Sequence, residues 1–493
     1  MSIAAASVFA VAAVFSRPLE RVSTMDPAMS QSIYDSHALR LVYSSVLDVD
    51  YSARPYRLAP CACSLPEVSP DGLSYVFKVV DPALTAHDVA RSLERLRDPS
   101  LVSPNAWIMK RVDAVDELDE RTVKITLSSR CHFFPWLMAM PSAAVMKEDG
   151  SGTGPYELAG WRKNHEMVFR RRVPSARGFD TVRYLVVDDV STQWLMFLRG
   201  EVDFLGEISR DNWDAVIGRD GRLDPALEAQ GVQLHSIPTL DVMYIGVNMK
   251  DPVLGRNRKL RQALNAAFDA PAWQRFYSGR VLAADGPVPP GVESRLETKF
   301  AYSFDLALAK RLMVEAGFPG GIDPATGRRL QLTLSIGRAS QDSRESGELL
   351  ASFYSKIGIR LELAFHTWDA FLRTVNEGRA QLFRMGWVGD YPDAENFLQL
   401  FHSRNASPGP NHADYANAAF DREYDAAMAA ASSVERDVHW RRCQEIVRED
   451  CPWIFTHYNK SNMLVRRRVG NFVPGVFSYG AESHFTVEGE AGK

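Results

Sequence analysis

Cysteine and histidine are scarce in this sequence. Five cysteines and 11 histidines occur among 493 residues. Cys61 and Cys63 lie too close together for a zinc knuckle, which needs two separated pairs of ligands, and no HExxH or comparable histidine spacing is present. We therefore expect no metal and no cofactor. The cysteines are expected to be free thiols, with one disulfide of unassigned partners left open.

Neither sign of charge is in excess. The chain carries 57 basic and 61 acidic residues, for a formal net charge of -4. Nucleic-acid binding depends on an excess of positive charge, so nucleic acid is not an expected partner. With 46% hydrophobic residues the composition is that of an average globular protein. A chain of this length can bury a large core and form two or three domains.

Long apolar runs are also absent. The stretch from Ala4 to Phe15 is shorter than the roughly 20 residues that a membrane-spanning helix needs. It has the length of a signal-peptide core, but no Lys or Arg precedes it. A first β-strand, or a start placed inside a longer signal, are the alternatives. We expect an exported protein with an atypical signal sequence.

Catalytic motifs are missing as well. The sequence contains no nucleophile elbow, no paired catalytic carboxylates and no metal-ligand spacing. Gly152 and Gly154 resemble a phosphate-binding loop only superficially, because no Gly-Lys-Ser/Thr follows them. We therefore expect that the protein is not an enzyme.

Strand and helix patterns alternate along the chain, which predicts an α/β protein. Strands are predicted where apolar residues recur at every second position: Val182, Tyr184 and Val186; Leu330, Leu332, Leu334 and Ile336; Ile359, Leu361 and Leu363. Helices are predicted where apolar residues share one face: Leu260, Ala263, Leu264, Ala267 and Phe268; Ala309, Leu312, Met313 and Ala316.

Local signals predict where several elements begin and end. Thr85 and Asp88 have the spacing of a capping box at a helix start, and Gly317 is placed to end another helix. Two turn-rich stretches, residues 148–155 (EDGSGTGP) and 284–292 (ADGPVPPGV), are candidate boundaries, the second more typical of a loop within a domain.

Nine segments, in order along more than four hundred residues, carry a family resemblance. They are STMDPA (23–28), SPDGLSYVFKV (69–79), TAHDVARSLERL (85–96), GTGPY (152–156), GEVD (200–203), Asn248 with KLRQALNAAFD (259–269), residues 310–317, GWVGDYPDAENF (386–397) and Pro452-Trp453. In this arrangement the chain resembles the family-5 extracellular solute-binding proteins, which include the dipeptide, oligopeptide and nickel binders of ABC importers.

The resemblance implies a type II periplasmic-binding-protein fold, in which two α/β lobes joined by a hinge enclose a ligand. On the family pattern, residues 1–42, 152–238 and 463–493 form lobe I. Residues 43–151 form an extra subdomain of lobe I, and residues 239–462 form lobe II.

The resemblance also implies ligand-binding residues. Asp390, at the aspartate of the GWxxD segment, is expected to pair with a peptide ammonium, and Trp387 and Tyr391 are expected to line the pocket. Arg338 is expected to bind the peptide carboxylate, since guanidinium groups hold carboxylates through two parallel hydrogen bonds. The alternatives are that Asp390 caps a turn, that Arg338 is a solvated loop residue, or that Arg344 takes its role.

The function implied is that of a monomeric, extracytoplasmic binding protein that captures short peptides and delivers them to the permease subunits of an ABC transporter. Two alternatives stay open. One is a different cargo in the same fold: a nickel chelate, haem, a cationic amine or an oligosaccharide. The other is a cytoplasmic ligand sensor.

Overall fold

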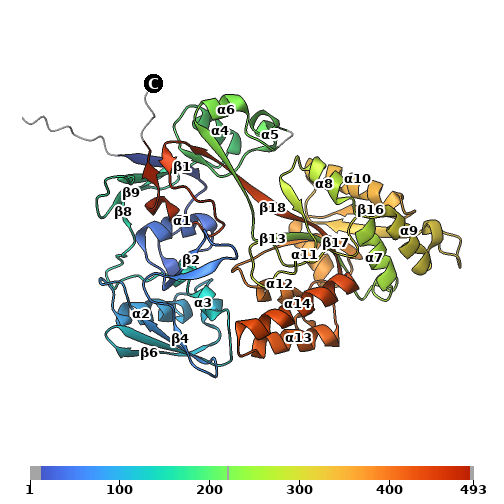
Figure 1. Cartoon of the computed structure of the whole chain (residues 1–493), viewed down its shortest axis with the longest axis horizontal. Coiled ribbons are helices and arrows are strands. Elements are labelled where there is room, and N and C mark those ends of the chain that lie inside the picture. Colours follow the sequence, from blue (N-terminus) through green and yellow to red (C-terminus); the bar gives the residue numbers. More distant parts are fainter. Residues whose placement is uncertain (1–12, 219–220, 489–493) are drawn as a thin grey trace, which may run out of the picture. The chain divides into compact units, whose positions relative to one another are not determined.

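The structure, a computed structural model, describes residues 13–218 and 221–488. The chain forms two compact units (Figure 1). Unit 1 contains the chain up to Ala53, then Arg57–Ile237 and the chain from Asn462, whereas unit 2 contains Arg54–Tyr56 and Pro238–Ser461. Of the apolar N-terminal stretch, Val14 and Phe15 open the first strand, and residues 4–12 lie outside the described residues.

Unit 1 is built around two four-stranded sheets. The first has the strand order β1-β10-β9-β8 and combines the parallel pair β1–β10 with antiparallel neighbours. The second, β4-β5-β7-β6, is antiparallel throughout. The strands are β1 (Val14–Leu19), β8 (Tyr156–Arg162), β9 (Glu166–Arg171) and β10 (Thr181–Val186), then β4 (Glu67–Val68), β5 (Ser74–Lys78), β6 (Val112–Asp119) and β7 (Thr122–Leu127).

Shorter pairings complete the strands of unit 1. The hairpin β2–β3 precedes the second sheet, β11 pairs with the end of β18, and β19 pairs with β20. Their bounds are β2 (Leu47–Asp50), β3 (Arg57–Pro60), β11 (Phe204–Leu205), β12 (Val232–Pro238), β18 (Trp453–Arg466), β19 (Val469–Gly470) and β20 (Thr486–Val487).

Most helices of unit 1 begin at side-chain caps; α3, preceded by Phe133, does not. In α2 (Ala86–Arg97), Thr85 accepts from the backbone N–H of Asp88 and Asp88 accepts in return from that of Thr85, which confirms the predicted capping box. A second capping box, formed by Ser32 and Asp35, starts α1 (Ile33–Val42). The remaining helices are α3 (Phe134–Leu137), α4 (Val190–Leu198), α5 (Arg210–Val216) and α6 (Pro225–Ala229).

Unit 2 contains one mixed sheet, ordered β18-β13-β17-β15-β16, with β14 paired to β18. Strand β15 is parallel to both of its neighbours, whereas β13 is antiparallel to both β17 and β18. The bounds are β13 (Asp241–Val247), β14 (Val281–Ala283), β15 (Gln331–Ile336), β16 (Arg360–Phe365) and β17 (Leu382–Val388). Strands β10, β15 and β16 confirm the three alternating patterns found in the sequence.

Helices pack against this sheet, and their sequences explain where they start and stop. The apolar stripes predicted near residues 260 and 310 form α7 and α9, and Gly317 follows α9 with a φ of 86°. The helices are α7 (Arg258–Ala267), α8 (Ala270–Phe276), α9 (Leu306–Glu315), α10 (Gln341–Ser355), α11 (Trp368–Asn376), α12 (Glu395–Leu398), α13 (Ala418–Ala429) and α14 (Ser433–Asp450).

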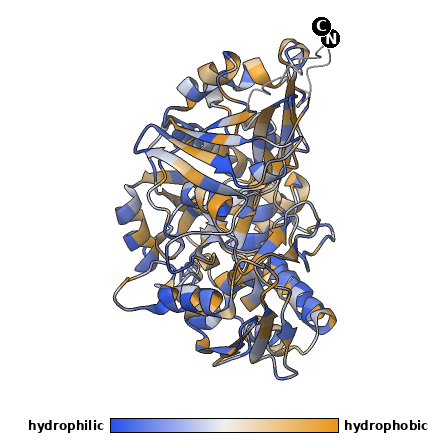
Figure 2. Ribbon diagram, turned by 90° about the vertical axis from the view of Figure 1, so that its left-hand side faces the viewer, coloured by the Kyte–Doolittle hydropathy of each residue, from blue (hydrophilic) through white to orange (hydrophobic). Residues whose placement is uncertain are grey.

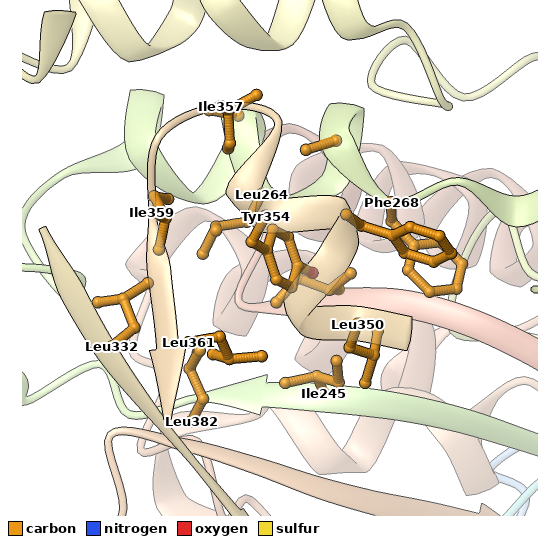
Figure 3. Packing of buried hydrophobic residues seen from close by; sticks show 14 of the residues in the cluster. Ile245, Leu264, Phe268, Leu332, Leu350, Tyr354, Ile357, Ile359, Leu361 and Leu382 are labelled. Atoms are coloured by element: carbon orange, nitrogen blue, oxygen red, sulfur yellow. The ribbon is translucent and has the colours of Figure 1, made fainter. Parts of the chain in front are cut away.

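The elements carry hydrophobic and hydrophilic residues in alternation, and Figure 2 shows both colours along most ribbons. In unit 2, the apolar faces of α7, α9 and α10 meet the sheet in one buried cluster (Figure 3). Tyr354 of α10 lies inside this cluster with 1% of its surface exposed. Its hydroxyl has no hydrogen-bond partner among the described residues, an arrangement that costs stability.

Strand β18 belongs to both units. Its first part, Trp453–Ser461, falls in unit 2 and pairs with β13 and β14. Its last part, from Asn462, falls in unit 1, where Leu464 and Val465 pair with β11. None of the described helices is long and apolar enough to cross a membrane.

Candidate functional site

The predicted site residues lie at one edge of the unit 2 sheet, where the parallel strands β15 and β17 end. Leu334 pairs with Leu382 and Ile336 pairs with Arg384. Arg338 follows the end of β15, and Asp390 follows the end of β17. Carboxyl ends of parallel strands are where open α/β sheets hold their ligands, so this edge is the candidate binding surface of unit 2.

Asp390 carries an anionic group that has no cationic partner. The side chain is exposed to solvent, and it forms no ion pair among the described residues. Surrounding protein atoms nevertheless raise its pKa above the ordinary value by desolvation, and a hydrogen bond with Asn396 opposes that shift. A positively charged ligand group would supply the missing compensation.

The backbone that carries Asp390 is fixed by close contacts. The N–H of Gly389 donates to the carbonyl of Leu240 at 2.7 Å. A β-carbon on Gly389 would lie 2.7 Å from a ring atom of Phe397 and 2.9 Å from the Leu240 side chain, so a larger residue here would have to displace those side chains. The Asp390 carboxylate therefore extends from a preorganised loop.

Trp387 lies beside Asp390 and shares a partner with it. The indole Nε1 donates to Oδ1 of Asn396 at 2.9 Å, and the backbone N–H of Asp390 contacts the same oxygen at 3.4 Å. Asn396 is buried with 1% of its surface exposed, whereas Trp387 is partly exposed. The amide thus orients both the indole ring and the carboxylate loop.

Tyr391 is held inside the protein. It is 5% exposed, and its hydroxyl donates to Oε2 of Glu395 at 2.6 Å, while the hydroxyl of Tyr424 donates to Oε1 of Glu395 at 2.6 Å. Burial and the negative charge of Glu395 raise the Tyr391 pKa well above its usual range. The hydroxyl therefore uses its proton in a hydrogen bond to Glu395, and contact of Tyr391 with a ligand stays a prediction.

Arg338 is an exposed cation with no acidic partner among the described residues. Continuing the β15–β17 register brings it level with Gly386, four residues before Asp390. At roughly 3.3 Å per residue, the two positions are at most about 13 Å apart along the strand direction. The structure thus brings Arg338 to the same edge as Asp390 without direct contact, and its role as a carboxylate ligand stays a prediction.

Arg384 is a second uncompensated cation, and the sequence reasoning missed it. It is partly buried on β17, six residues before Asp390. Nη1 donates to the hydroxyl of Ser346 at 2.7 Å and Nη2 to the hydroxyl of Tyr277 at 2.8 Å. The guanidinium also lies 5.6 Å from the centre of the Trp273 ring. No carboxylate within the described part of the chain neutralises it.

A signal for Arg384 was present in the sequence. The segment Leu382-Phe383-Arg384-Met385 places one charge inside an otherwise apolar strand. Because a partly buried charge is costly unless it is paired, such a residue is a functional candidate. The GWxxD segment, which implies the other site residues, starts two residues later and does not include it.

This edge therefore combines one anion with two cations, separated along the strands. The arrangement is complementary to a ligand with a positive group at one end and a negative group at the other. Within the described residues, no group of three or more His, Cys, Asp or Glu side chains could hold a metal ion.

The architecture matches solved binding proteins over nearly the whole chain. The structure of HbpA2 from Haemophilus parasuis superposes with a TM-score of 0.85 at 21% identity, covering 96% of this chain and 100% of that one. The two α/β units thus have the type II periplasmic-binding-protein fold.

Sequence comparison defines the family. The model of bacterial extracellular solute-binding proteins, family 5, matches residues 58–408, and the chain belongs to that family. Heme-binding protein A of Haemophilus influenzae is 25% identical over 97% of this chain and 90% of its own length. Glutathione-binding protein GsiB of Escherichia coli K12 is 24% identical over 88% of this chain and 86% of its own.

Proposed function

We propose that this protein is the extracytoplasmic solute-binding component of an ABC importer and that its cargo is a short peptide with free termini. The observation that carries the cargo assignment is the set of uncompensated charges in unit 2: Asp390 faces no cation, and Arg384 and Arg338 face no anion. A short peptide supplies one ammonium and one carboxylate, which are the two charges that this edge lacks.

The spacing of the charges supports a peptide of a few residues. Arg338 and Arg384 lie level with positions four and six residues before Asp390, which is at most about 13 and 20 Å along the strand direction. An extended peptide spans about 3.3–3.6 Å per residue. A peptide of two to five residues therefore bridges the carboxylate and the guanidinium groups once the long arginine side chains are taken into account.

The comparisons support the same cargo class. Glutathione, the ligand named for one relative, is a tripeptide with a free ammonium and two carboxylates. The name of another relative specifies haem, which offers carboxylates for the arginines but no cation for Asp390. The unpaired carboxylate thus favours the peptide, and we propose that the chain binds and delivers its cargo to membrane permease subunits as a monomer without chemical change.

The first experiment identifies the cargo. Native mass spectrometry of the protein purified from its host, followed by release of bound molecules, is expected to yield a series of masses that fit two- to five-residue peptides. A single non-peptide mass would contradict the cargo assignment and leave the family assignment intact.

Calorimetry then tests the charges one by one. A tripeptide with free termini is compared with its N-acetylated form and its C-terminal amide, on wild type and on Arg384→Gln. Acetylation is expected to weaken binding of both proteins equally. Amidation is expected to weaken binding to wild type by roughly 10- to 30-fold, as for a lost charged hydrogen bond, and to have a smaller effect on Arg384→Gln. An equal amidation effect on both proteins would exclude Arg384, and repeating the cycle with Arg338→Gln tests the other cation.

A further inference from the structure

Two cysteines in unit 1 lie in a turn that brings them close together. The N–H of Cys61 donates to the carbonyl of Cys63 at 3.0 Å, so the chain folds back on itself over three residues. The N–H of Cys63 in turn donates to the carbonyl of Val46 at 2.9 Å. Both thiols are free in the structure. Because consecutive α-carbons are about 3.8 Å apart, residues two apart in a folded-back segment have α-carbons close to the range that a disulfide bridges.

The surroundings of the two sulfurs differ. Cys61 is partly exposed, and Nη1 of Arg40 donates to its sulfur at 3.8 Å. Arg40 is buried and also pairs with Asp48, at 2.5 Å. Cys61 is therefore reachable from solvent and has a guanidinium donor at its sulfur.

Cys63, by contrast, is fully buried. Burial raises the pKa of its thiol to about 12, and the nearby Cys61 sulfur adds to that shift. Cys63 is thus inert toward reagents in solution, and it is close enough to Cys61 for a negative charge on that sulfur to raise its pKa. One accessible sulfur next to one buried sulfur is the arrangement of an attacking and a resolving cysteine.

We propose that Cys61 and Cys63 form a redox-active pair whose oxidant is a low-molecular-weight disulfide. The Cys61 thiolate attacks one sulfur of that disulfide, its S–S bond breaks, and one small thiolate leaves. The Cys63 thiol then gives up its proton as its sulfur attacks Cys61, and the second small thiolate leaves. Two protein thiols are oxidised to one disulfide, and the small disulfide is reduced to two thiols, which take up the two protons.

The ring size makes the bond reversible. A disulfide between residues two apart closes a small ring, whose strain makes the bond easier to reduce than a structural disulfide. The pair also follows the hairpin β2–β3, whose connecting residues Arg54–Tyr56 are counted with unit 2.

The test uses the whole protein and hydroxyethyl disulfide, a probe with no charge and no peptide character. Reduced, desalted protein is treated with the probe and analysed by intact and peptide mass spectrometry. Wild type is expected to lose the mass of two hydrogens, located to a peptide that contains both Cys61 and Cys63. Cys63→Ser is expected to stop at a mixed disulfide on Cys61, which gains the mass of one mercaptoethanol residue.

Two controls make the outcome decisive. Cys61→Ser is expected to abolish both products, and Cys443→Ser, at a buried thiol near the carbonyl of Phe420, is expected to leave them unchanged. Timed alkylation of unmodified wild type by iodoacetamide is expected to label Cys61 before the four buried cysteines, which needs no variant. Oxidation elsewhere in the chain, or failure of Cys63→Ser to trap the mixed disulfide, would overturn the proposal.

Discussion

Two arginines in this molecule differ in how the protein compensates their positive charge. In unit 1, Arg468 binds the buried Asp203 with two donors, Nε at 2.6 Å and Nη2 at 2.7 Å. In unit 2, Arg384 uses its donors on the neutral hydroxyls of Ser346 and Tyr277 and has no carboxylate partner. The first arrangement is complete within the protein, whereas the second leaves a charge that a ligand can satisfy.

The difference indicates how to separate structural from functional charges. A charge that the protein compensates stabilises the fold, and its removal should affect unfolding more than binding. A charge that the protein leaves uncompensated costs folding free energy, and its removal should affect binding more than unfolding. Four substitutions and conditions test this separation, from the largest expected effect to the smallest.

Asp390→Asn keeps the shape of the side chain and removes its charge. Affinity for a free-terminus tripeptide is expected to fall on the order of 100-fold, because the peptide ammonium loses its anionic partner. Calorimetry measures the affinity, and urea unfolding of the ligand-free protein is expected to show no loss of stability, since desolvation already disfavours the ionised form. Unchanged affinity would exclude Asp390 as the ammonium partner.

Asp203→Asn tests the opposite case in unit 1. Asp203 is 3% exposed and also accepts from the N–H of Ser16 at 2.9 Å. Its neutralisation leaves Arg468 unpaired, and the free energy of unfolding is expected to fall by about 2–3 kcal/mol, after allowance for the partial exposure of Arg468. Peptide affinity should stay within twofold of wild type at a temperature where both proteins are folded. A large change in peptide affinity at unchanged stability would contradict the separation of structural from functional charges.

The pH dependence of binding should report the raised pKa of Asp390. Peptide affinity is expected to be constant near neutral pH and to fall, by up to about tenfold per pH unit, as the pH drops through that pKa. The fall should therefore begin above the ordinary aspartate value of 3.8. The folded protein holds this proton more tightly than the unfolded chain, so the same group destabilises the ligand-free protein as pH rises through the same range. In Asp390→Asn, both dependences should be absent.

Tyr354→Phe extends the comparison from charges to neutral groups. The hydroxyl removed is buried without a partner among the described residues, so the free energy of unfolding is expected to rise by about 1 kcal/mol. Urea denaturation measures the change. Tyr415→Phe is the matched control: that hydroxyl donates to Oδ2 of Asp450 at 2.6 Å, and its loss is expected to destabilise. Equal effects of the two substitutions on the free energy of unfolding would contradict the view that a hydroxyl without a partner costs stability and a hydrogen-bonded one contributes it.

Local patterns predicted much of the fold. The capping box of α2 and the alternating strands β10, β15 and β16 depend on residues close together in the chain, and the structure has them where the sequence indicated. The strand order β18-β13-β17-β15-β16 depends on pairings between distant segments. No local pattern encodes those pairings, so the order came only with the structure.

The candidate site was predicted in part for the same reason. The GWxxD segment led to Trp387, Asp390 and Tyr391, which are neighbours along the chain. The network that fixes Tyr391 needs Glu395 and Tyr424, and the donors of Arg384 reach Ser346 and Tyr277. Such partners, tens of residues apart, meet only after the helices pack on the sheet.

The shared strand β18 limits how this protein can be dissected. A fragment cut at the boundary between Ser461 and Asn462 would divide one strand of 14 residues and leave β11 without its pairing partner. Each half would then display unpaired backbone donors and acceptors, which promote aggregation through strand addition. Fragments or permuted chains made for isolated-domain spectroscopy, split reporters or circular permutation should therefore retain residues 453–466 intact and place new ends in exposed loops.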